Sequence, residues 1–365
     1  MDSSPFASIR RIVLCYPVEP HQIDQMRGTL ETLQSDPSSA LDHTVEIVNA
    51  GQERINDLLP TADIFIGHAK VPVQWGRVLD AGRLRWIQSS AAGLDHCLVP
   101  GVIADDRIVV SSAAGLFAPQ VAEQTFCLMM GLLRRIGLFE RARPPREFVR
   151  LPTDDLRGKT VGIVGLGGNG REIARMLSPW DVQIVATDVY TVDRPDEVDQ
   201  LRPADHLDWL CRVADIIVLT LPLNRSTHHV FSSAQFAAMK PGAYLINVAR
   251  GPVVDEAALE AALADGKLAG VGVDVTEVEP LPTDSPLWDD DRVLITPHVG
   301  AQSARRVSDT TDLVCENLRR FFAGQTLINH VDKSLGFPHP SVAWSKYQSD
   351  PDRFQPGDLD DPVAS

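Results

Sequence analysis

Two side chains late in the sequence carry chemistry suited to binding a carboxylate and moving a proton. Arg250 follows the apolar run in LINVARGPVVDE, and His298 follows the run in VLITPHVG. A guanidinium can grip a carboxylate through two parallel hydrogen bonds, and an imidazole can exchange a proton with a carbonyl oxygen near neutral pH. Each has an ordinary alternative: Arg250 could pair with Asp255 or Glu256, and an isolated histidine is more often structural.

Three acidic residues lie between these two segments. Asp274, Glu277 and Glu279 follow the apolar run in GVGVDVTEVEPLP, before a proline-rich loop. In an open parallel α/β sheet, ligands bind at the carboxyl ends of the strands, and all these segments end apolar runs. A carboxylate beside His298 would hold the imidazole in one tautomer.

Other reactive-looking residues are given no role. The adjacent His228 and His229 of THHV are expected to point in opposite directions on any regular element. The sequence has no HExxH pair, no EF-hand type of aspartate cluster and no G-x-S-x-G turn. We therefore expect no metal site and no serine nucleophile.

A glycine-rich turn joins a buried strand to an amphipathic helix in VGIVGLGGNGREIARML. Gly165 permits the tight turn, Gly167 lets the backbone approach a pyrophosphate, and Gly170 lets the helix pack close to the sheet. The N–H groups and the dipole at the helix start then face an anionic diphosphate. Between these glycines stand Gly168 and Asn169, where Asn169 tolerates an unusual φ and offers an extra donor to phosphate.

Asp188 is the acidic companion that such a turn needs. It ends the next apolar run, VATD, near the spacing at which a carboxylate takes the adenosine ribose hydroxyls. A carboxylate there repels a 2′-phosphate, so the pattern predicts NAD rather than NADP. The alternative is a glycine-rich turn whose aspartate only caps a strand end. Strand, glycines, helix and Asp188 together favour the dinucleotide site.

Apolar runs separated by helix-length segments predict the elements that position these residues. The first runs span 11–16, 45–50, 63–67, 84–90 and 107–112, and each is expected to be a strand buried on both faces. The rhythm restarts with runs at 160–165, 183–188, 214–222, 243–249, 268–275 and 292–297. Helices are expected at 119–136, apolar around most of its circumference, and at 302–323, with an irregular connection at 140–160. The predicted fold class is α/β, with two doubly wound parallel sheets.

A second glycine-bearing turn occurs earlier, in QSSAAGLDH. A strand that ends in small residues leaves the backbone N–H groups of Ala92 and Gly93 able to hold a small anion. Taken alone, this stretch fits an ordinary strand-to-helix turn better.

Bulk properties narrow the class of protein. A chain of 365 residues predicts two domains. The net charge of −15 argues against nucleic acid or an anionic membrane as a partner. No apolar run is long enough for a membrane span. The five cysteines are scattered without a CxxC pair, so we expect free thiols in a reducing cytoplasm.

With these segments in order, residues 10–332 resemble the D-isomer-specific 2-hydroxyacid dehydrogenases, including the glyoxylate/hydroxypyruvate reductase and phosphoglycerate dehydrogenase branches. The motifs that carry the resemblance are GLGGNG, Asp188, LPLNRST, NVARGPVVDE, GVDVTEVEPLP and TPHVGA. Each motif is weak by itself, whereas six in the same order are specific.

The resemblance implies a role for each matched position. Arg250 would bind the substrate carboxylate and carbonyl, and Glu279 would pair with His298, the acid/base. The backbone of Ala92 and Gly93 would hold the substrate carboxylate. The cofactor contacts would come from Gly165, Gly167, Gly168, Asn169, Gly170, Asp188, Leu221, Pro222, Val248, Asp274, His298 and Ala301.

The resemblance also implies an architecture. Residues 1–118 would begin a flavodoxin-like substrate domain, 119–299 would form a Rossmann NAD-binding domain, 300–332 would return to the substrate domain, and 333–365 would form a polar, proline-rich tail. The protein would be a cytoplasmic homodimer built through the NAD-binding domain. It would use NAD and a small 2-oxo or 2-hydroxy acid, with no metal.

Two other functions remain open from the sequence, and a third is disfavoured. A phosphoglycerate dehydrogenase-like enzyme is one, although SSAAGLDHC supplies no basic residue for a phosphate. An NAD(H)-sensing binding protein similar to the C-terminal-binding-protein co-repressors is another, because those keep the catalytic residues. Formate dehydrogenase-like members have glutamine where His298 stands, which argues against that reading.

Overall fold

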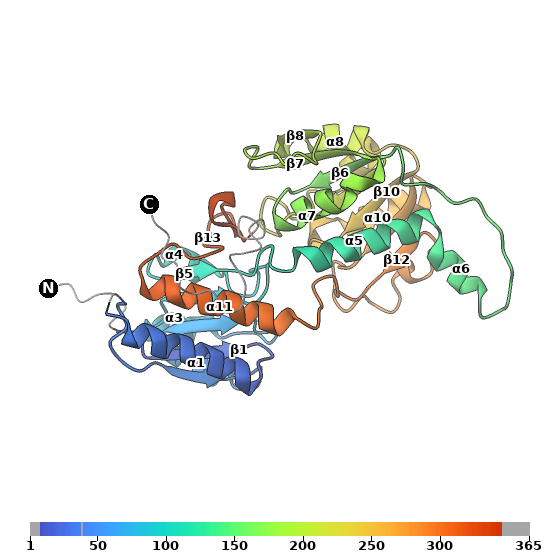
Figure 1. Ribbon diagram of the computed structural model, residues 1–365. Coiled ribbons are helices and arrows are strands. Elements are labelled where there is room, and N and C mark those ends of the chain that lie inside the picture. The colour runs from blue at the N-terminus through green and yellow to red at the C-terminus, as the bar shows by residue number, and fades with distance from the viewer. Residues whose placement is uncertain (1–7, 38, 345–365) are drawn as a thin grey trace. The chain divides into compact units, whose positions relative to one another are not determined.

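The computed structural model describes residues 8–37 and 39–344, and the chain divides into two compact units. Met1–Leu116 and Ala304–Ser365 make up the five-strand unit, and Phe117–Ser303 make up the seven-strand unit (Figure 1). The part of the predicted tail at 345–365 lies outside the described residues.

The five-strand unit is built on one parallel sheet. Its strands are β1 (Arg11–Cys15), β2 (Glu46–Asn49), β3 (Ile64–Gly67), β4 (Trp86–Ser89) and β5 (Val109–Ser111). They lie in the order β2-β1-β3-β4-β5, which is the flavodoxin-like order. This fulfils the predicted fold class for the first part of the chain.

Alternate residues of β1 face opposite layers of this unit. Ile12 and Leu14 pack toward α1 (Pro20–Ser35) and α11 (Arg306–Phe322). Val13 and Cys15 pack into the opposite core, which includes residues of α2 (Ile55–Leu58), α3 (Trp75–Ala81) and α4 (Pro100–Ala104). A strand buried on both faces therefore reads as a continuous apolar run.

The prediction of burial on both faces is wrong for the second run. Glu46 and Asn49 of β2 are exposed, and the two residues between them are only partly buried. β2 is an edge strand with a single neighbour, β1, so less of its surface is covered.

The helix near the end of the chain is tied into this unit by buried polar contacts. The Asn317 side chain donates to Gln88 Oε1 at 2.7 Å and accepts from the Ile328 backbone at 2.8 Å. Farther along, β13 (Val331–Asp332) pairs antiparallel with β14 (Phe337–Pro338), and the Lys333 ammonium caps carbonyl groups at the end of α4. Segments far apart in sequence thus complete one core.

The seven-strand unit holds β6 (Thr160–Val164), β7 (Gln183–Asp188), β8 (Gln200–Pro203), β9 (Ile216–Leu219), β10 (Ala243–Asn247), β11 (Leu268–Val273) and β12 (Val293–Ile295). All are parallel, in the order β12-β11-β10-β9-β6-β7-β8. This is the dinucleotide-binding strand order extended by one strand. The sequence did not predict β8, because its four residues include Arg202 and Pro203 and lie at the exposed edge.

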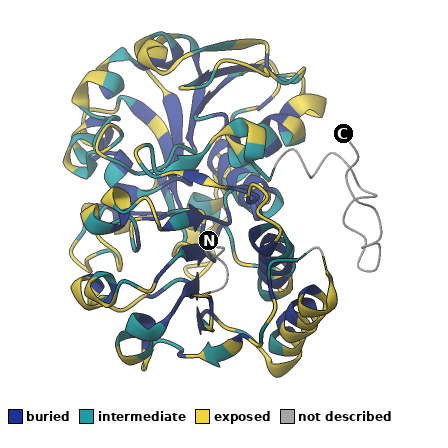
Figure 2. Ribbon diagram, turned by 90° about the vertical axis from the view of Figure 1, so that its left-hand side faces the viewer, coloured by how far each residue is buried: buried dark blue, intermediate teal, exposed yellow. Residues whose placement is uncertain are grey.

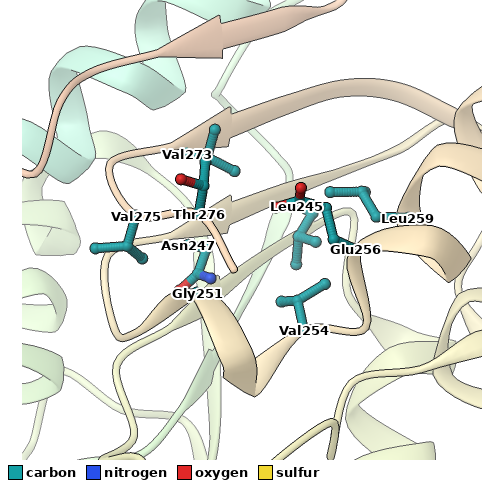
Figure 3. A pocket seen from close by; sticks show the side chains of 9 residues that line it. All are labelled: Leu245, Asn247, Gly251, Val254, Glu256, Leu259, Val273, Val275 and Thr276. Atoms are coloured by element: carbon teal, nitrogen blue, oxygen red, sulfur yellow. The ribbon is translucent and has the colours of Figure 1, made fainter. Parts of the chain in front are cut away.

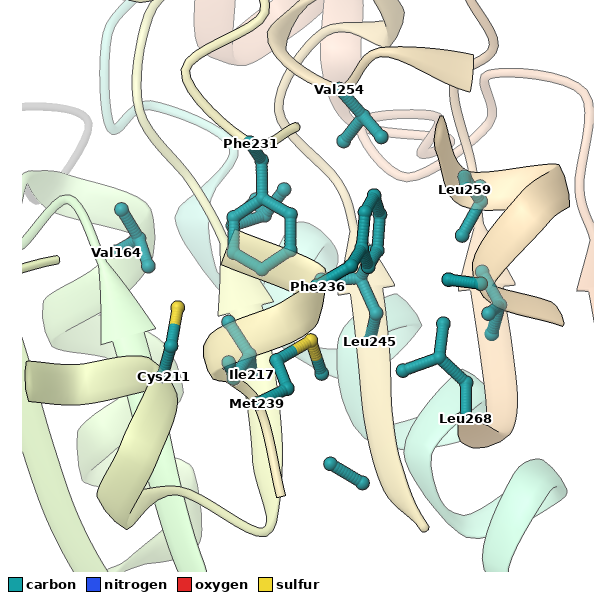
Figure 4. Packing of buried hydrophobic residues seen from close by; sticks show 14 of the residues in the cluster. Val164, Cys211, Ile217, Phe231, Phe236, Met239, Leu245, Val254, Leu259 and Leu268 are labelled. Carbon is teal, nitrogen blue, oxygen red and sulfur yellow. The ribbon is translucent and has the colours of Figure 1, made fainter. Parts of the chain in front are cut away.

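Helices cover both faces of this sheet, and Figure 2 shows the buried strands in dark blue. Residues of α5 (Ala118–Leu133) and α7 (Gly168–Leu177) share one core. Residues of α8 (Leu207–Val213), α9 (Ser233–Ala238) and α10 (Glu256–Ala264) share the other, where Phe231, Phe236 and Met239 lie near Leu245 of β10 (Figure 4).

The helix predicted at 119–136 ends earlier and is not buried all round. α5 stops at Leu133, because Arg135 takes a left-handed φ of 54° before α6 (Ile136–Ala142) begins. Glu123 and Cys127 of α5 are exposed. Residues 143–159 form no helix or strand, in line with the predicted irregular connection. Among the described residues, no helix has both the length and the hydropathy that a bilayer crossing requires.

Candidate active site

The carboxyl edge of the seven-strand sheet gathers the candidate residues of this unit. The glycine turn follows β6, Asp188 ends β7, and Leu221 and Pro222 follow β9. Val248 and Arg250 follow β10, Asp274 and Glu279 follow β11, and His298 through Ala301 follow β12. Because the strands are parallel, these segments share one edge. Ala92 and Gly93 belong to the other unit, after β4.

Each glycine of the turn after β6 has its own geometric reason. Gly165 has a φ of +95°, and a Cβ there would lie 2.9 Å from the backbone nitrogen of Leu221. A Cβ on Gly170 would overlap the carbonyl oxygen of Gly165, so a side chain would push α7 away from the sheet. A Cβ on Gly167 would meet no atom within 4 Å. The turn is therefore tight on its protein side and open at Gly167.

The start of α7 fits a phosphate group. Gly167 is the N-cap and contributes no side chain, so no side chain caps the first N–H groups of this ten-residue helix. Those groups and the helix dipole can stabilise a diphosphate. Gly168 and Asn169 form the first turn. Asn169 is helical there, so its tolerance of an unusual φ is not used.

Asp188 holds the glycine turn against the end of β7. Its carboxylate accepts the backbone N–H of Leu166 at 2.5 Å and that of Tyr190 at 2.8 Å. The strand-end cap that the sequence offered as an alternative is therefore present. Asp188 is partly exposed and lies at the end of the strand next to β6, which is where the sequence predicts a ribose-binding carboxylate.

His298 and Glu279 form a close pair. Imidazole Nδ1 lies 2.9 Å from Glu279 Oε2, and the two side chains are 43% and 42% exposed. A carboxylate at Nδ1 favours the tautomer in which Nδ1 carries the hydrogen, and it stabilises the imidazolium. Within the described part of the chain, Nε2 has no hydrogen-bond partner. The arrangement leaves Nε2 available for proton exchange with a ligand.

Asp274 shapes the loop that carries His298. The backbone of His298 is left-handed, with a φ of 54°, and its N–H donates to the Asp274 carbonyl at 2.7 Å. The buried Asp274 carboxylate accepts from Val299 N at 2.9 Å, Gly300 N at 2.8 Å and the Thr296 hydroxyl at 2.6 Å. Such backbone conformations persist where the surroundings over-determine them. Asp274 thus fixes the loop from which the His298 imidazole extends.

Arg250 stands three residues beyond β10. One guanidinium nitrogen donates to the Ala249 carbonyl at 2.8 Å, and the Asn247 side chain donates to the Arg250 carbonyl. The two acids offered as its ion-pair partners serve backbone groups instead. Asp255 caps α10 by accepting from Ala258 N, and Glu256 accepts from Glu277 N.

A second histidine–carboxylate pair was not predicted from the sequence. The rings of His228 and His229 lie 4.0 Å apart with an interplanar angle of 34°, so the prediction that they point in opposite directions is wrong. The reason is the left-handed φ of 51° at His229, which takes the segment out of any regular element. His229 Nε2 lies 2.7 Å from Glu277 Oε1. No spacing in the sequence signals a contact between residues so far apart.

Beside this pair lies a small pocket between the start of α10 and the loops after β10 and β11 (Figure 3). Its lining includes Asn247, Gly251, Glu256 and Thr276. Burial, with the nearby Glu277 carboxylate as a further cause, raises the pKa of Glu256 above its usual value, although a backbone hydrogen bond from Glu277 opposes this. Among the described residues, no group of three or more His, Cys, Asp or Glu could hold a metal ion.

The turn after β4 in the five-strand unit is also set up to hold an anion. Ser89 Oγ accepts the N–H of Ala91 at 3.1 Å. The next two N–H groups, of Ala92 and Gly93, make no hydrogen bond within the described residues, and both residues reach the surface. Both N–H groups are therefore available to an anion or to solvent.

Comparison with known proteins places this site in a class. Residues 126–300 match the D-isomer specific 2-hydroxyacid dehydrogenase NAD binding domain. A glyoxylate reductase of Thermofilum pendens is 35% identical over 68% of this chain and 75% of its own length. A hydroxypyruvate reductase of Thermotoga maritima is 32% identical over 69% and 82% of the two chains.

A solved structure is similar over almost the whole fold. The D-isomer specific 2-hydroxyacid dehydrogenase from Xanthobacter autotrophicus Py2, in complex with NADPH and MES, is 28% identical with a TM-score of 0.71, over 90% of this chain and 99% of that one. The sheets, the site and these relatives define an oxidoreductase with a nicotinamide-dinucleotide domain. The chain belongs to the D-isomer-specific 2-hydroxyacid dehydrogenase family.

Proposed function

We propose that the protein is an NAD-dependent reductase of a small 2-oxo acid, such as hydroxypyruvate or glyoxylate, and that the product is the 2-hydroxy acid, with the D configuration where C2 becomes a stereocentre. The observation that carries this proposal is the 2.9 Å contact between His298 Nδ1 and Glu279 Oε2, which lies at the same edge of the sheet as Arg250. The three residues follow β12, β11 and β10, which are neighbours in the sheet. An acid/base and a carboxylate-binding cation are what reduction of a 2-oxo acid requires.

Each side chain has a defined task in this proposal. Arg250 binds the substrate carboxylate and supports the negative charge that develops on the carbonyl oxygen. His298, protonated and held by Glu279, donates its Nε2 proton to that oxygen. When bound, NADH supplies the hydride for C2, so hydride and proton together convert the ketone to the alcohol.

The preference for NAD over NADP rests on the end of β7. Asp188 places a carboxylate there, and this charge would repel a 2′-phosphate. The nearest basic residue along this segment is Arg194, and its guanidinium donates to the carbonyl groups of Val198 and Asp199. The Nη1 group of Arg194 is thus directed at the backbone, whereas the Xanthobacter relative is in complex with NADPH.

The deciding experiment follows NADH absorbance with a panel of 2-oxo acids, and repeats it with NADPH. Turnover of glyoxylate or hydroxypyruvate supports the proposal and narrows the substrate. Tight NADH binding without turnover of any panel member contradicts the proposal and favours an NAD(H)-sensing protein.

Replacing the acid at the end of β7 tests the cofactor preference. Asp188→Ala should shrink the ratio of kcat/KM for NADH over NADPH by about tenfold or more, because the repulsion is lost. Asp188→Asn is the variant of matched size, although its single carboxamide oxygen can accept only one of the two N–H groups, of Leu166 and Tyr190, that the two carboxylate oxygens accept. A ratio unchanged in both variants would remove Asp188 from the ribose site.

We further propose that the protein is a cytoplasmic homodimer that associates through the seven-strand unit. Apolar side chains of this unit are exposed in α6 and in the irregular segment 143–159 that follows it: Ile136 is 52% exposed and Phe148 is 88% exposed. All five thiols are free, as a reducing compartment would keep them. Light scattering on the wild type and on Phe148→Ser tests the association, and a wild-type mass of one chain would contradict it.

A further inference from the structure

We propose that His229 is a positioning residue that holds the Arg250 loop and the Glu279 loop in a fixed relation. The inference rests on the proposed function, because it takes Arg250 and Glu279 as members of the reaction site. His229 lies outside that set of residues and contacts each loop two residues from its functional side chain: at Pro252 in one and at Glu277 in the other.

The contact with the Arg250 loop is made by backbone groups. The N–H of His229 donates to the Pro252 carbonyl at 2.8 Å. Beside it, Phe231 N donates to Val253 O at 3.1 Å, and Asp255 N donates to Phe231 O at 3.0 Å. The segment from His229 to Phe231 therefore runs alongside the chain that follows Arg250 and is bonded to it at three points.

The contact with the Glu279 loop is made by the imidazole. His229 Nε2 lies 2.7 Å from Glu277 Oε1, with the two side chains 35% and 30% exposed. The other oxygen of Glu277 accepts the N–H of Glu256 at 3.2 Å, and Glu256 returns the bond by accepting the N–H of Glu277 at 3.0 Å. Glu277 is thus held on both sides, and His229 is its side-chain partner.

The two loops also touch directly. A Cβ on Gly251 would overlap the carbonyl of Thr276, so backbone lies against backbone there, and Figure 3 shows both residues at the same pocket. A movement of one loop is therefore transmitted to the other. Among the described residues, the side-chain contact that would remain here without the imidazole is a reciprocal pair. In it, the carboxylates of Glu256 and Glu277 each accept the backbone N–H group of the other residue. A small displacement of catalytic groups has a large cost in rate.

Two substitutions of His229 separate its reach from its size. His229→Asn suits the left-handed φ of 51°, but its amide ends near the position of Nδ1 and cannot reach Glu277. His229→Gln extends to about the position of Nε2 and keeps a donor for the carboxylate. His228→Asn is the matched control, because the His228 ring packs at a tilt against that of His229 and its side chain makes no hydrogen bond among the described residues.

The measurements are kcat and KM for the 2-oxo acid, the Kd of NADH, and Tm. His229→Asn should lower kcat/KM about tenfold through both a lower kcat and a higher KM, while the Kd of NADH stays unchanged. His229→Gln should recover to within about threefold of wild type, and His228→Asn should stay within about twofold. Glu277→Gln tests the same contact from the other loop should His229→Asn fail to fold.

The outcomes discriminate between the two proposals. Wild-type protein that binds NADH and reduces no 2-oxo acid overturns the proposed function and this inference with it. Wild-type turnover together with an unaffected His229→Asn overturns the inference alone. Equal losses in His229→Asn, His229→Gln and His228→Asn would show that the site needs only the packed rings, which also overturns the inference.

Discussion

The seven-strand unit contains two histidine–glutamate pairs that differ in which ring nitrogen meets the carboxylate. His298 uses Nδ1 toward Glu279, and His229 uses Nε2 toward Glu277. Both histidines have left-handed backbones, with φ of 54° and 51°. The carboxylates are only two residues apart in the loop after β11. Residue type and local backbone are therefore almost the same in the two pairs.

The two pairs differ in which nitrogen of the ring is turned away from the carboxylate. Nδ1 is next to the backbone, so a carboxylate there leaves the far end of His298 for a ligand. Nε2 is the far end, and in His229 the protein itself occupies it. The same two residue types can thus form a proton-transfer pair or a structural tie. Pairing with a carboxylate therefore does not by itself identify a catalytic histidine.

The largest effect is expected from removing the imidazole whose Nε2 is available. His298→Asn should lower kcat by about a thousandfold or more, because the proton donor is lost, while NADH still binds. Turnover with each 2-oxo acid and fluorescence titration of NADH measure the two quantities. His229→Asn is the matched comparison, with its loss of about tenfold. Similar losses in the two variants would erase the distinction between the pairs.

An intermediate effect is expected from the two carboxylates. Glu279→Gln should lower kcat about a hundredfold, because the imidazolium of His298 loses its stabilising charge and its fixed orientation. Glu277→Gln keeps the same loop and should cost about tenfold, since it loosens a tie and leaves the reacting groups in place. Steady-state kinetics across pH measures both. The reverse order would assign the catalytic pair to Glu277.

The smallest effect is expected from Glu256, which borders the His229 pair. Its folded pKa is raised, first by burial and then by Glu277, although a backbone hydrogen bond opposes the shift. The folded state therefore favours the protonated form. That stabilisation is present below the ordinary glutamate pKa of 4.5 and is lost as the pH rises through the raised folded pKa.

Glu256→Gln should accordingly flatten the dependence of the free energy of unfolding on pH just above 4.5. At neutral pH it should change stability by less than about 1 kcal/mol, because the site is partly exposed to solvent. Denaturant unfolding at a series of pH values measures this. A steeper dependence in the variant than in wild type would mean that the Glu256 carboxylate is stabilised as the charged form.

Much of the fold was predictable because buried parallel strands appear as continuous apolar runs. The runs that contain β1 and β6 were identified for this reason, and the glycine turn was recognised from Gly165, Gly167 and Gly170 together. Strands at sheet edges were less predictable. β2 was taken for a fully buried strand, and β8 was missed, because an edge strand needs less apolar surface. The predicted helix at 119–136 is divided by the left-handed backbone at Arg135, and no sequence pattern predicts that conformation.

The sequence by itself determined the order of the strands along the chain and the glycine turn with Asp188. It also determined which residue types follow the strands at the carboxyl edge: arginine, carboxylates and histidines. Only the tertiary structure decided which histidine meets which carboxylate and through which nitrogen. That choice depends on left-handed backbones at His229 and His298 and on hydrogen bonds from distant segments, such as those of Asp274 to the loop after β12. Local sequence records the chemistry of a side chain, whereas its direction is set by contacts between segments that only folding brings together.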